Sequence, residues 1–228
     1  YVIMLLASTW GMLIFLGIRF YRSMYTDEGY LSHTLPVTAN QLFLSKVLVS
    51  GVWYLFITIG IGISVVALIV SLMTGLLNIG ELSSVLTQYN GNIWEFLADA
   101  FYELGRTYEE EMGINLLHYG ITLLLTYVAG PFITMVTLFG ALTIGQLSSK
   151  HKGFMGILAY AGVTILSSII GSTVQSAFMF GTNVMSSQSG ISVSANSAYD
   201  INVITSLLLA AIMYGVSYYI MNKKLNLD

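Results

Sequence analysis

Residues 43–77 read FLSKVLVSGVWYLFITIGIGISVVALIVSLMTGLL, an apolar run whose only charged side chain is Lys46, near its start. A helix needs about 20 mostly apolar residues to cross the roughly 30 Å hydrocarbon layer of a membrane. We therefore predict a membrane-spanning helix here. It is longer than one crossing requires, so it either tilts or places its first turns at the membrane interface.

Four more stretches have the same character, and their apolar residues do not alternate as they would in barrel strands. They cover about residues 1–18, 114–147, 154–174 and 201–221. Within residues 114–147, Pro131 removes a backbone donor and predicts a kink. The sequence thus predicts an all-α fold, a polytopic transmembrane helix bundle with five visible spans in a single domain.

The composition requires lipid, rather than water, around most of the chain. Hydrophobic residues make up 56% of the 228 positions and charged residues only 8%, against roughly 25% charged in ordinary soluble domains. The net charge of -3 provides no basic field for phosphates, which excludes nucleic acid as a partner. Cysteine is absent, so disulfides, thiolate metal ligands and thiol nucleophiles are excluded together.

The basic side chains predict which ends of the spans face the cytoplasm, where Lys and Arg accumulate. They flank the first connection, fill the third and follow the last span: Arg19, Arg22, Lys46, Lys150, Lys152, Lys223 and Lys224. The two other connections, about residues 78–113 and 175–200, hold most of the acids and a single base, Arg106. We expect these two connections to be external and the C-terminus to be cytoplasmic.

This orientation places Tyr1 at the outer face. The chain opens inside an apolar run, without the charged segment that begins a signal peptide. We therefore expect an incomplete N-terminus. If the natural N-terminus is cytoplasmic, one additional span precedes Tyr1 and the bundle has six.

The external segments differ in character. Residues 93–111 carry aromatic and apolar side chains among acids in a helical pattern. This pattern fits an amphipathic helix at the membrane interface, and it fits equally a small solvated cap over the bundle. Residues 182–197 are rich in Ser, Gly and Asn, which predicts a loop.

No nucleotide-binding or catalytic motif occurs in the sequence. The pattern G-x-x-x-x-G-K-[ST] is missing, so any ATP and Mg²⁺ would be bound by another subunit. H-E-x-x-H and G-x-S-x-G are also missing, and the three histidines are scattered. We expect no enzyme activity, metal site or directly bound cofactor in this chain. His118 is interpreted as a polar anchor near the interface rather than as a proton relay.

The middle of every predicted span is free of Asp, Glu, Lys and Arg, which ion-coupled transporters usually keep there. This pattern argues against ion-coupled transport and leaves uncharged polar residues as candidate linings of a path. They are Thr137, Thr143, Gln146, Ser167, Ser168 and Gln175. The alternative interpretation is that these side chains hold neighbouring helices together.

The first cytoplasmic connection, about residues 20–42, is both polar and aromatic, and we refer to it as the elbow. Asp27-Glu28-Gly29 is a turn signal, and Pro36 ends any helix that begins at Tyr30. Thr38 and Gln41 have the spacing of a capping box that opens the next helix. The apolar groups of the elbow favour contact with a partner, or they lie back on the bilayer surface.

The elbow resembles that of permease subunits of the ABC-2 class of ATP-binding-cassette transporters, in particular a group common in Gram-positive bacteria. The resemblance rests on short motifs: Asp27-Glu28-Gly29-Tyr30-Leu31, Thr34-Leu35-Pro36-Val37, Gln41 and Ser45-Lys46, and later Gly145-Gln146-Leu147 followed by Lys150-His151-Lys152. Together with the hydropathy profile these cover most of the chain. Members of the family have six spans and a cytoplasmic N-terminus.

The resemblance implies a permease of an ATP-driven exporter in the cell membrane, paired with a second permease copy or homologue. Two separate ABC ATPase subunits would bind ATP and dock beneath the bundle, and a coupling helix at about residues 25–41 would seat in a groove of the ATPase. Peptide, lipid-like and drug cargoes are all compatible with it. The alternative is a membrane scaffold or immunity-type protein that binds a partner through the elbow and transports nothing.

Overall fold

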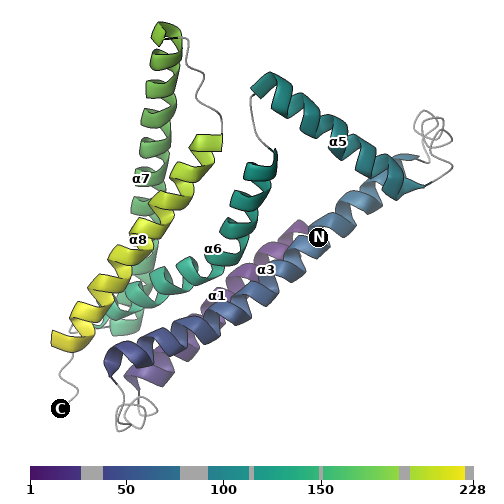
Figure 1. The fold of residues 1–228 in the computed structure, drawn as a ribbon. Helices are drawn as coiled ribbons and strands as arrows, with labels where there is room; N and C mark the ends of the chain where they lie inside the picture. The colour runs from purple at the N-terminus through teal and green to yellow at the C-terminus, as the bar shows by residue number, and fades with distance from the viewer. Residues whose placement is uncertain (27–37, 78–91, 113–115, 149–150, 190–195, 224–228) are drawn as a thin grey trace.

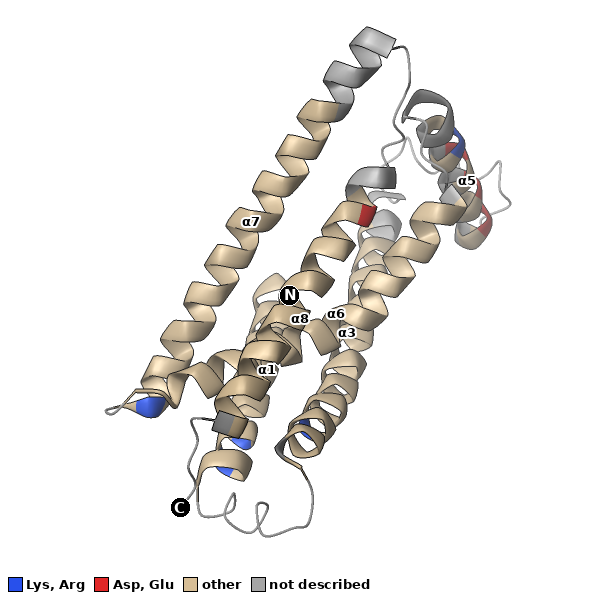
Figure 2. Cartoon of the chain, turned by 60° about the vertical axis from the view of Figure 1, so that its left-hand side comes forward, with Lys and Arg blue, Asp and Glu red and all other residues tan. Residues whose placement is uncertain are grey.

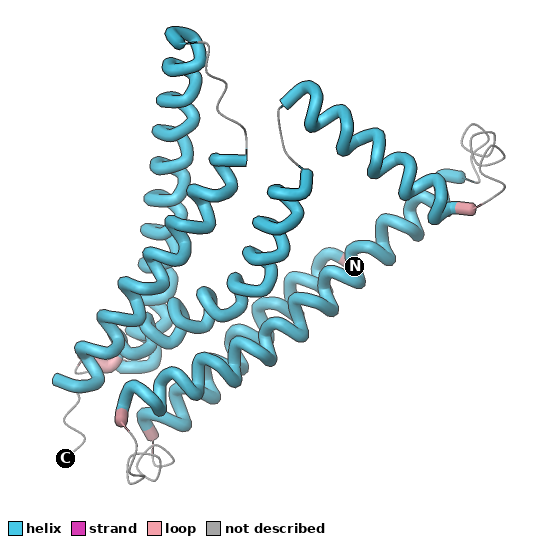
Figure 3. Tube along the Cα trace, in the orientation of Figure 1, coloured by secondary structure: helices cyan, strands magenta, loops and turns pink. Residues whose placement is uncertain are grey.

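The computed structural model describes residues 1–26, 38–77, 92–112, 116–148, 151–189 and 196–223, and these residues contain six α-helices (Figures 1 and 3). Five of the helices are long and apolar enough to cross a membrane, as the sequence predicts for a multi-pass membrane protein. They are α1 (Val2–Tyr25), α3 (Ala39–Leu77), α6 (Leu116–Gly145), α7 (Lys152–Ser189) and α8 (Asn196–Lys223). The sixth, α5 (Ile93–Met112), is the amphipathic helix predicted for residues 93–111.

Helix α6 organises the bundle, because it packs against α1, α3, α7 and α8. It remains one helix through Pro131, and Figure 1 shows it bending near its middle, as the proline predicts. Helices α3 and α7 lie on opposite sides of α6 (Figure 1). The distance between them increases with distance from the end of the bundle where the C-terminus lies. The described helices are therefore closest together at the C-terminal end of the bundle.

Charge divides the bundle as the sequence predicts. Figure 2 shows the Lys and Arg of the five spans at the end near the C-terminus, and the Asp and Glu at the opposite end, on α5 and at the start of α8. Arg19 and Arg22 lie in the last turns of α1, Lys46 near the start of α3 and Lys152 at the start of α7. We call these two ends the basic end and the acidic end.

Three predicted boundaries are corrected. Helix α1 continues past Arg19 to Tyr25, where basic side chains near a helix C-terminus are favourable. Helix α7 continues to Ser189 and α8 begins at Asn196, so the predicted loop at residues 182–197 is wrong for 182–189 and for 196–197. Extending an existing helix costs far less than starting one, which allows Ser and Asn to continue α7. The predicted external segment 175–200 accordingly begins within a helix.

Helices α3 and α7 contain 39 and 38 residues. At 1.5 Å per residue each is almost 60 Å long, about twice the hydrocarbon thickness. The excess length predicted for residues 43–77 is thus real. Helix α5 lies at the acidic end, packs against α6 and exposes Trp94 and Tyr102, which favours the membrane interface over a closed cap.

Candidate functional site

The two roots of the elbow are the last turns of α1 and the first turns of α3. The capping box predicted at the second root is confirmed. The Thr38 amide donates to Gln41 Oε1 at 3.1 Å, and the Gln41 amide donates to Thr38 Oγ1 at 3.3 Å. This capping box fixes the start of α3, within the second root of the elbow. The other elbow residues of the predicted site, Asp27, Glu28, Gly29, Tyr30, Leu31, Thr34, Leu35, Pro36 and Val37, lie outside the described residues.

Both roots are held in a cluster of buried side chains at the basic end, which we call the basal core. Its members from α1, α3, α6 and α8 are Leu13, Leu16, Phe20, Met24, Leu42, Phe43, Val47, Met135, Leu138, Phe139, Leu142 and Met221. The Phe20 ring stacks on Phe139 with centroids 3.9 Å apart, and its edge meets Phe43 at 6.0 Å. Stacking of this kind joins both elbow roots to α6.

Two hydrogen bonds also connect the roots of the elbow to neighbouring helices. Tyr25 Oη lies 2.8 Å from Thr143 Oγ1. Because Thr143 donates its own proton to the Phe139 carbonyl, Tyr25 must be the donor to Thr143. Across the bundle, the Tyr214 hydroxyl of α8 donates to Asn40 Oδ1 at the start of α3. Each elbow root is thus tied to a different helix beyond it, one to α6 and one to α8.

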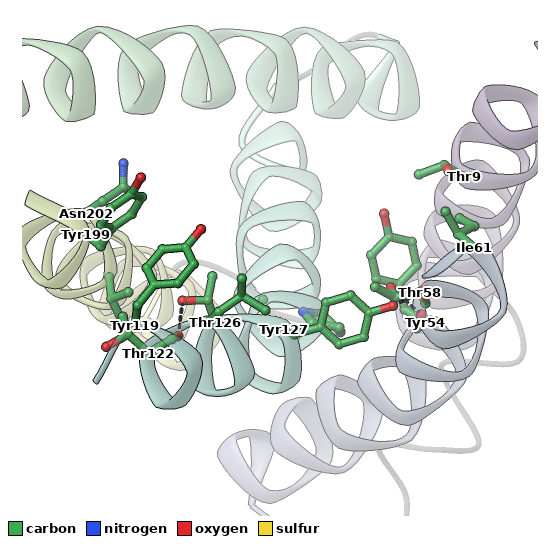
Figure 4. A pocket seen from close by; sticks show the side chains of 14 residues that line it. Thr9, Tyr54, Thr58, Ile61, Tyr119, Thr122, Thr126, Tyr127, Tyr199 and Asn202 are labelled. Carbon is green, nitrogen blue, oxygen red and sulfur yellow. Dashed lines mark hydrogen bonds between the residues drawn. The ribbon is translucent and has the colours of Figure 1, made fainter. Parts of the chain in front are cut away.

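Towards the acidic end the helices separate around a cavity of about 530 Å³, the tyrosine cavity. Its wall comes from α1, α3, α6 and α8: Thr9, Tyr54, Thr58, Ile61, Tyr119, Thr122, Leu123, Thr126, Tyr127, Gly130, Pro131, Tyr199, Asn202 and Val203. Figure 4 shows Tyr127 of α6 extending towards Thr58 of α3, where its hydroxyl donates to the Thr58 carbonyl. The bend of α6 at Pro131 forms part of this wall.

A second hollow, the polar groove, lies between α7 and α8 and measures about 410 Å³. It is lined by Ser167, Ser168, Gly171, Ser172, Gln175, Asn202, Thr205, Ser206 and Leu209. Asn202 lines both hollows, so they adjoin at this residue. The two hollows therefore share a wall residue, and all the side chains that line them are uncharged.

The structure divides the predicted path residues into two groups. Ser167, Ser168 and Gln175 line the polar groove together. Thr143 is completely buried in contact with Tyr25, a placement that favours the packing role. Thr137 donates to the Thr134 carbonyl, and Gln146 donates to the Leu142 carbonyl within its own helix, and neither lines either hollow.

A polar cluster joins α6 and α8 beside the wall of the tyrosine cavity. His118 Nε2 lies 3.0 Å from each Asp200 oxygen, and Thr122 donates to Asp200 Oδ1 at 3.2 Å. Nearby, the rings of Tyr119 and Tyr199 meet edge to face at 4.8 Å. His118 thus connects α6 with α8, and its role as an anchor at the membrane interface stays a prediction.

The tyrosine cavity was not identified from the sequence, although a signal was present. Tyr119, Thr122 and Thr126 recur at spacings of three and four on α6, as do Tyr54, Thr58 and Ile61 on α3. Such spacing places polar and aromatic groups on one face of each helix. The spacing alone does not predict that these two helix faces lie opposite each other.

Comparison of the chain with protein-family models, curated proteins and solved structures finds no match. The resemblance to ABC-2 permeases therefore rests on the short motifs of the elbow and of the connection at residues 145–152.

Proposed function

We propose that this chain is the membrane-spanning permease subunit of an ATP-driven ABC exporter of the ABC-2 class. A separate ATPase subunit binds ATP and Mg²⁺ and docks on the elbow, and the permease pairs with a second copy or homologue. The protein resides in the cell membrane of a Gram-positive bacterium. One observation carries the proposal: both roots of the elbow are locked into the basal core, whereas the opposite ends of the helices surround the tyrosine cavity.

This arrangement is suited to transmitting a movement of the elbow to α6 and α8. Force on the elbow reaches α6 through Phe20, Phe139 and the bond from Tyr25 to Thr143. It reaches α8 through Asn40 and Tyr214. Both α6 and α8 line the tyrosine cavity, and α8 also lines the polar groove. If the basal core moves as a unit, closure of the ATPase subunits shifts α6 and α8. This shift alters the tyrosine cavity and the polar groove that these helices line.

The charge distribution supports a cytoplasmic elbow. The Lys and Arg of the spans lie at the end from which the elbow leaves (Figure 2), and such an excess marks the cytoplasmic side. ATP is found on that side, so an ATPase subunit there has access to the elbow. Large apolar side chains are exposed along all five spans, and lipid and a second permease copy are the partners that would cover them.

Charge reversal at Asp27 and Glu28 tests the coupling. The chain is co-expressed with a candidate ABC ATPase partner, and ATP hydrolysis by the purified complex is compared with that of the ATPase alone. We expect stimulation by the unaltered chain and at least about a tenfold smaller stimulation with Asp27→Lys and Glu28→Lys, because reversed charges on the elbow would oppose docking of the ATPase.

The matched control reverses acids at the other end of the bundle, with Glu95→Lys and Asp99→Lys on α5, and should leave stimulation unchanged. Equal stimulation by the elbow variant and this control would remove the docking role from Asp27 and Glu28. An ATPase that binds the chain without any change in hydrolysis or transport would instead favour the scaffold or immunity-type protein.

A further inference from the structure

The wall of the tyrosine cavity has an unusual chemical character for a space inside a membrane protein. Four of its side chains are tyrosines, contributed by α3, α6 and α8: Tyr54, Tyr119, Tyr127 and Tyr199. Its residues include no Lys, Arg or His. The volume of about 530 Å³ lies within the range of about 300–1,000 Å³ typical of small-molecule sites. Aromatic faces carry a negative potential that attracts cations.

A carboxylate lies beside the wall of this cavity, hydrogen-bonded to one of its residues. Asp200 follows Tyr199 directly and accepts a hydrogen bond from Thr122, and both neighbours line the cavity. His118 Nε2 contacts the same carboxylate at 3.0 Å. The side chains of His118 and Asp200 remain 49% and 39% exposed, so a ligand can approach them.

The surroundings reinforce this charge. The acidic end carries Glu95, Asp99 and Glu103 on α5, and its described base, Arg106, lies 3.6 Å from Glu103. The other described Lys and Arg lie at the basic end (Figure 2). The cavity wall thus offers tyrosine rings to a cation and no basic side chain to an anion. The described carboxylates at this end of the bundle favour the approach of a cation.

We propose that the tyrosine cavity binds an amphiphilic organic cation, a molecule that joins a bulky apolar body to a positive charge. Its role as a cargo site rests on the proposed transport function, whereas binding itself requires only this chain. The apolar body occupies the space among the four rings, and the positive charge faces the ring surfaces and Asp200. The competing occupant is a neutral lipid acyl chain, for which neither the rings nor the carboxylate would matter.

Tetraphenylphosphonium and tetraphenylborate distinguish these occupants, because the two ions share a shape and differ in the sign of their charge. Binding of each is measured by equilibrium dialysis against the purified chain in non-ionic detergent at pH 8, where imidazole groups are neutral, after subtraction of uptake by empty micelles. We expect the phosphonium ion to bind at least about tenfold more tightly than the borate. Equal binding of the two ions would overturn the proposal.

Substitutions locate the binding. Tyr199→Leu removes a ring and Asp200→Asn removes the charge, and each should weaken phosphonium binding about three- to tenfold. Tyr199→Phe keeps the ring and should bind as the unaltered chain does. The matched control, Tyr218→Leu, removes an exposed ring near the other end of α8 and should have no effect.

Unchanged or tighter binding by Tyr199→Leu would identify an acyl-chain pocket and refute the cation site. A variant that no longer elutes as a single species is replaced by Tyr119→Leu, with the same expectations. Because the assay contains no ATPase, it fails independently of the proposed function. Loss of the cation site with intact ATPase stimulation refutes only this inference, and phosphonium binding without stimulation refutes only the coupling.

Discussion

Replacing Phe139 by alanine is expected to lower the free energy of unfolding by about 2 kcal/mol or more and to abolish ATPase stimulation. Phe139 is fully buried and stacks on Phe20. Removing a buried ring leaves a cavity whose walls lose their contacts, at a cost of about 24 cal/mol per Å³. In lipid this loss of packing dominates, since apolar side chains gain little from leaving an equally apolar solvent.

The same substitution removes the contact between α1 and α6 made by Phe20. A movement of the elbow should then no longer be transmitted to α6 and the rest of the bundle. Unfolding is followed in mixed micelles by titration with a denaturing detergent, and ATP hydrolysis is measured on the complex. Phe154→Ala is the control, because Phe154 lies near the same end of the bundle but is 62% exposed. If Phe139→Ala and Phe154→Ala shift the unfolding midpoint equally, the basal core does not stabilise the fold as described here.

Gly145→Ala is expected to force α6 and α7 apart at the basic end. A Cβ atom at this position would lie 2.4 Å from the Gly156 amide nitrogen, 2.5 Å from its Cα and 3.0 Å from the Lys152 carbonyl oxygen. These are backbone atoms, so no rotamer change can relieve the clash. Overpacking of this kind costs roughly 1–3 kcal/mol, and the unfolding midpoint should fall accordingly.

Substitutions at two further glycines provide a comparison for the loss of stability expected from Gly145→Ala. At Gly156 a Cβ would meet the end of the Leu142 side chain at 2.9 Å, which can shift, and the Leu142 Cα at 3.3 Å, a milder contact than those at Gly145. At Gly162 it would meet nothing within 4 Å. We expect the loss of stability to decrease from Gly145→Ala through Gly156→Ala to Gly162→Ala, the last being neutral or slightly stabilising because alanine favours helices. A Gly145→Ala chain as stable as Gly162→Ala would contradict the close approach of α6 and α7.

The hydropathy pattern was sufficient to predict the spans, because the cost of unpaired backbone in lipid leaves helices as the only fit for non-alternating apolar runs. The capping box was equally predictable, since Thr38 and Gln41 interact across only three residues. The charge distribution predicted the two ends of the bundle because Lys46 and Lys152, distant in sequence, each lie near the start of a helix at the same end.

Helix ends and tertiary contacts were less predictable. The extension of α7 to Ser189 depends on continuation of a helix already formed, which local composition does not reveal. The tyrosine cavity is lined by residues of α1, α3, α6 and α8 together, so it depends on contacts between segments that are distant in the sequence. Thr143 illustrates the limit, because its sequence context suited a path as well as a packing contact.

The orientation of the bundle is tested most directly by labelling single cysteines in intact cells, and the chain is ready for this because it contains no cysteine. Ser32→Cys places a thiol in the elbow, and Tyr102→Cys places one on α5, where Tyr102 is 72% exposed. With a membrane-impermeant maleimide we predict labelling of Tyr102→Cys in intact cells and of Ser32→Cys only after permeabilisation. Labelling of Ser32→Cys in intact cells at the rate of Tyr102→Cys would place the elbow outside, where no ATPase could dock, and would contradict the account.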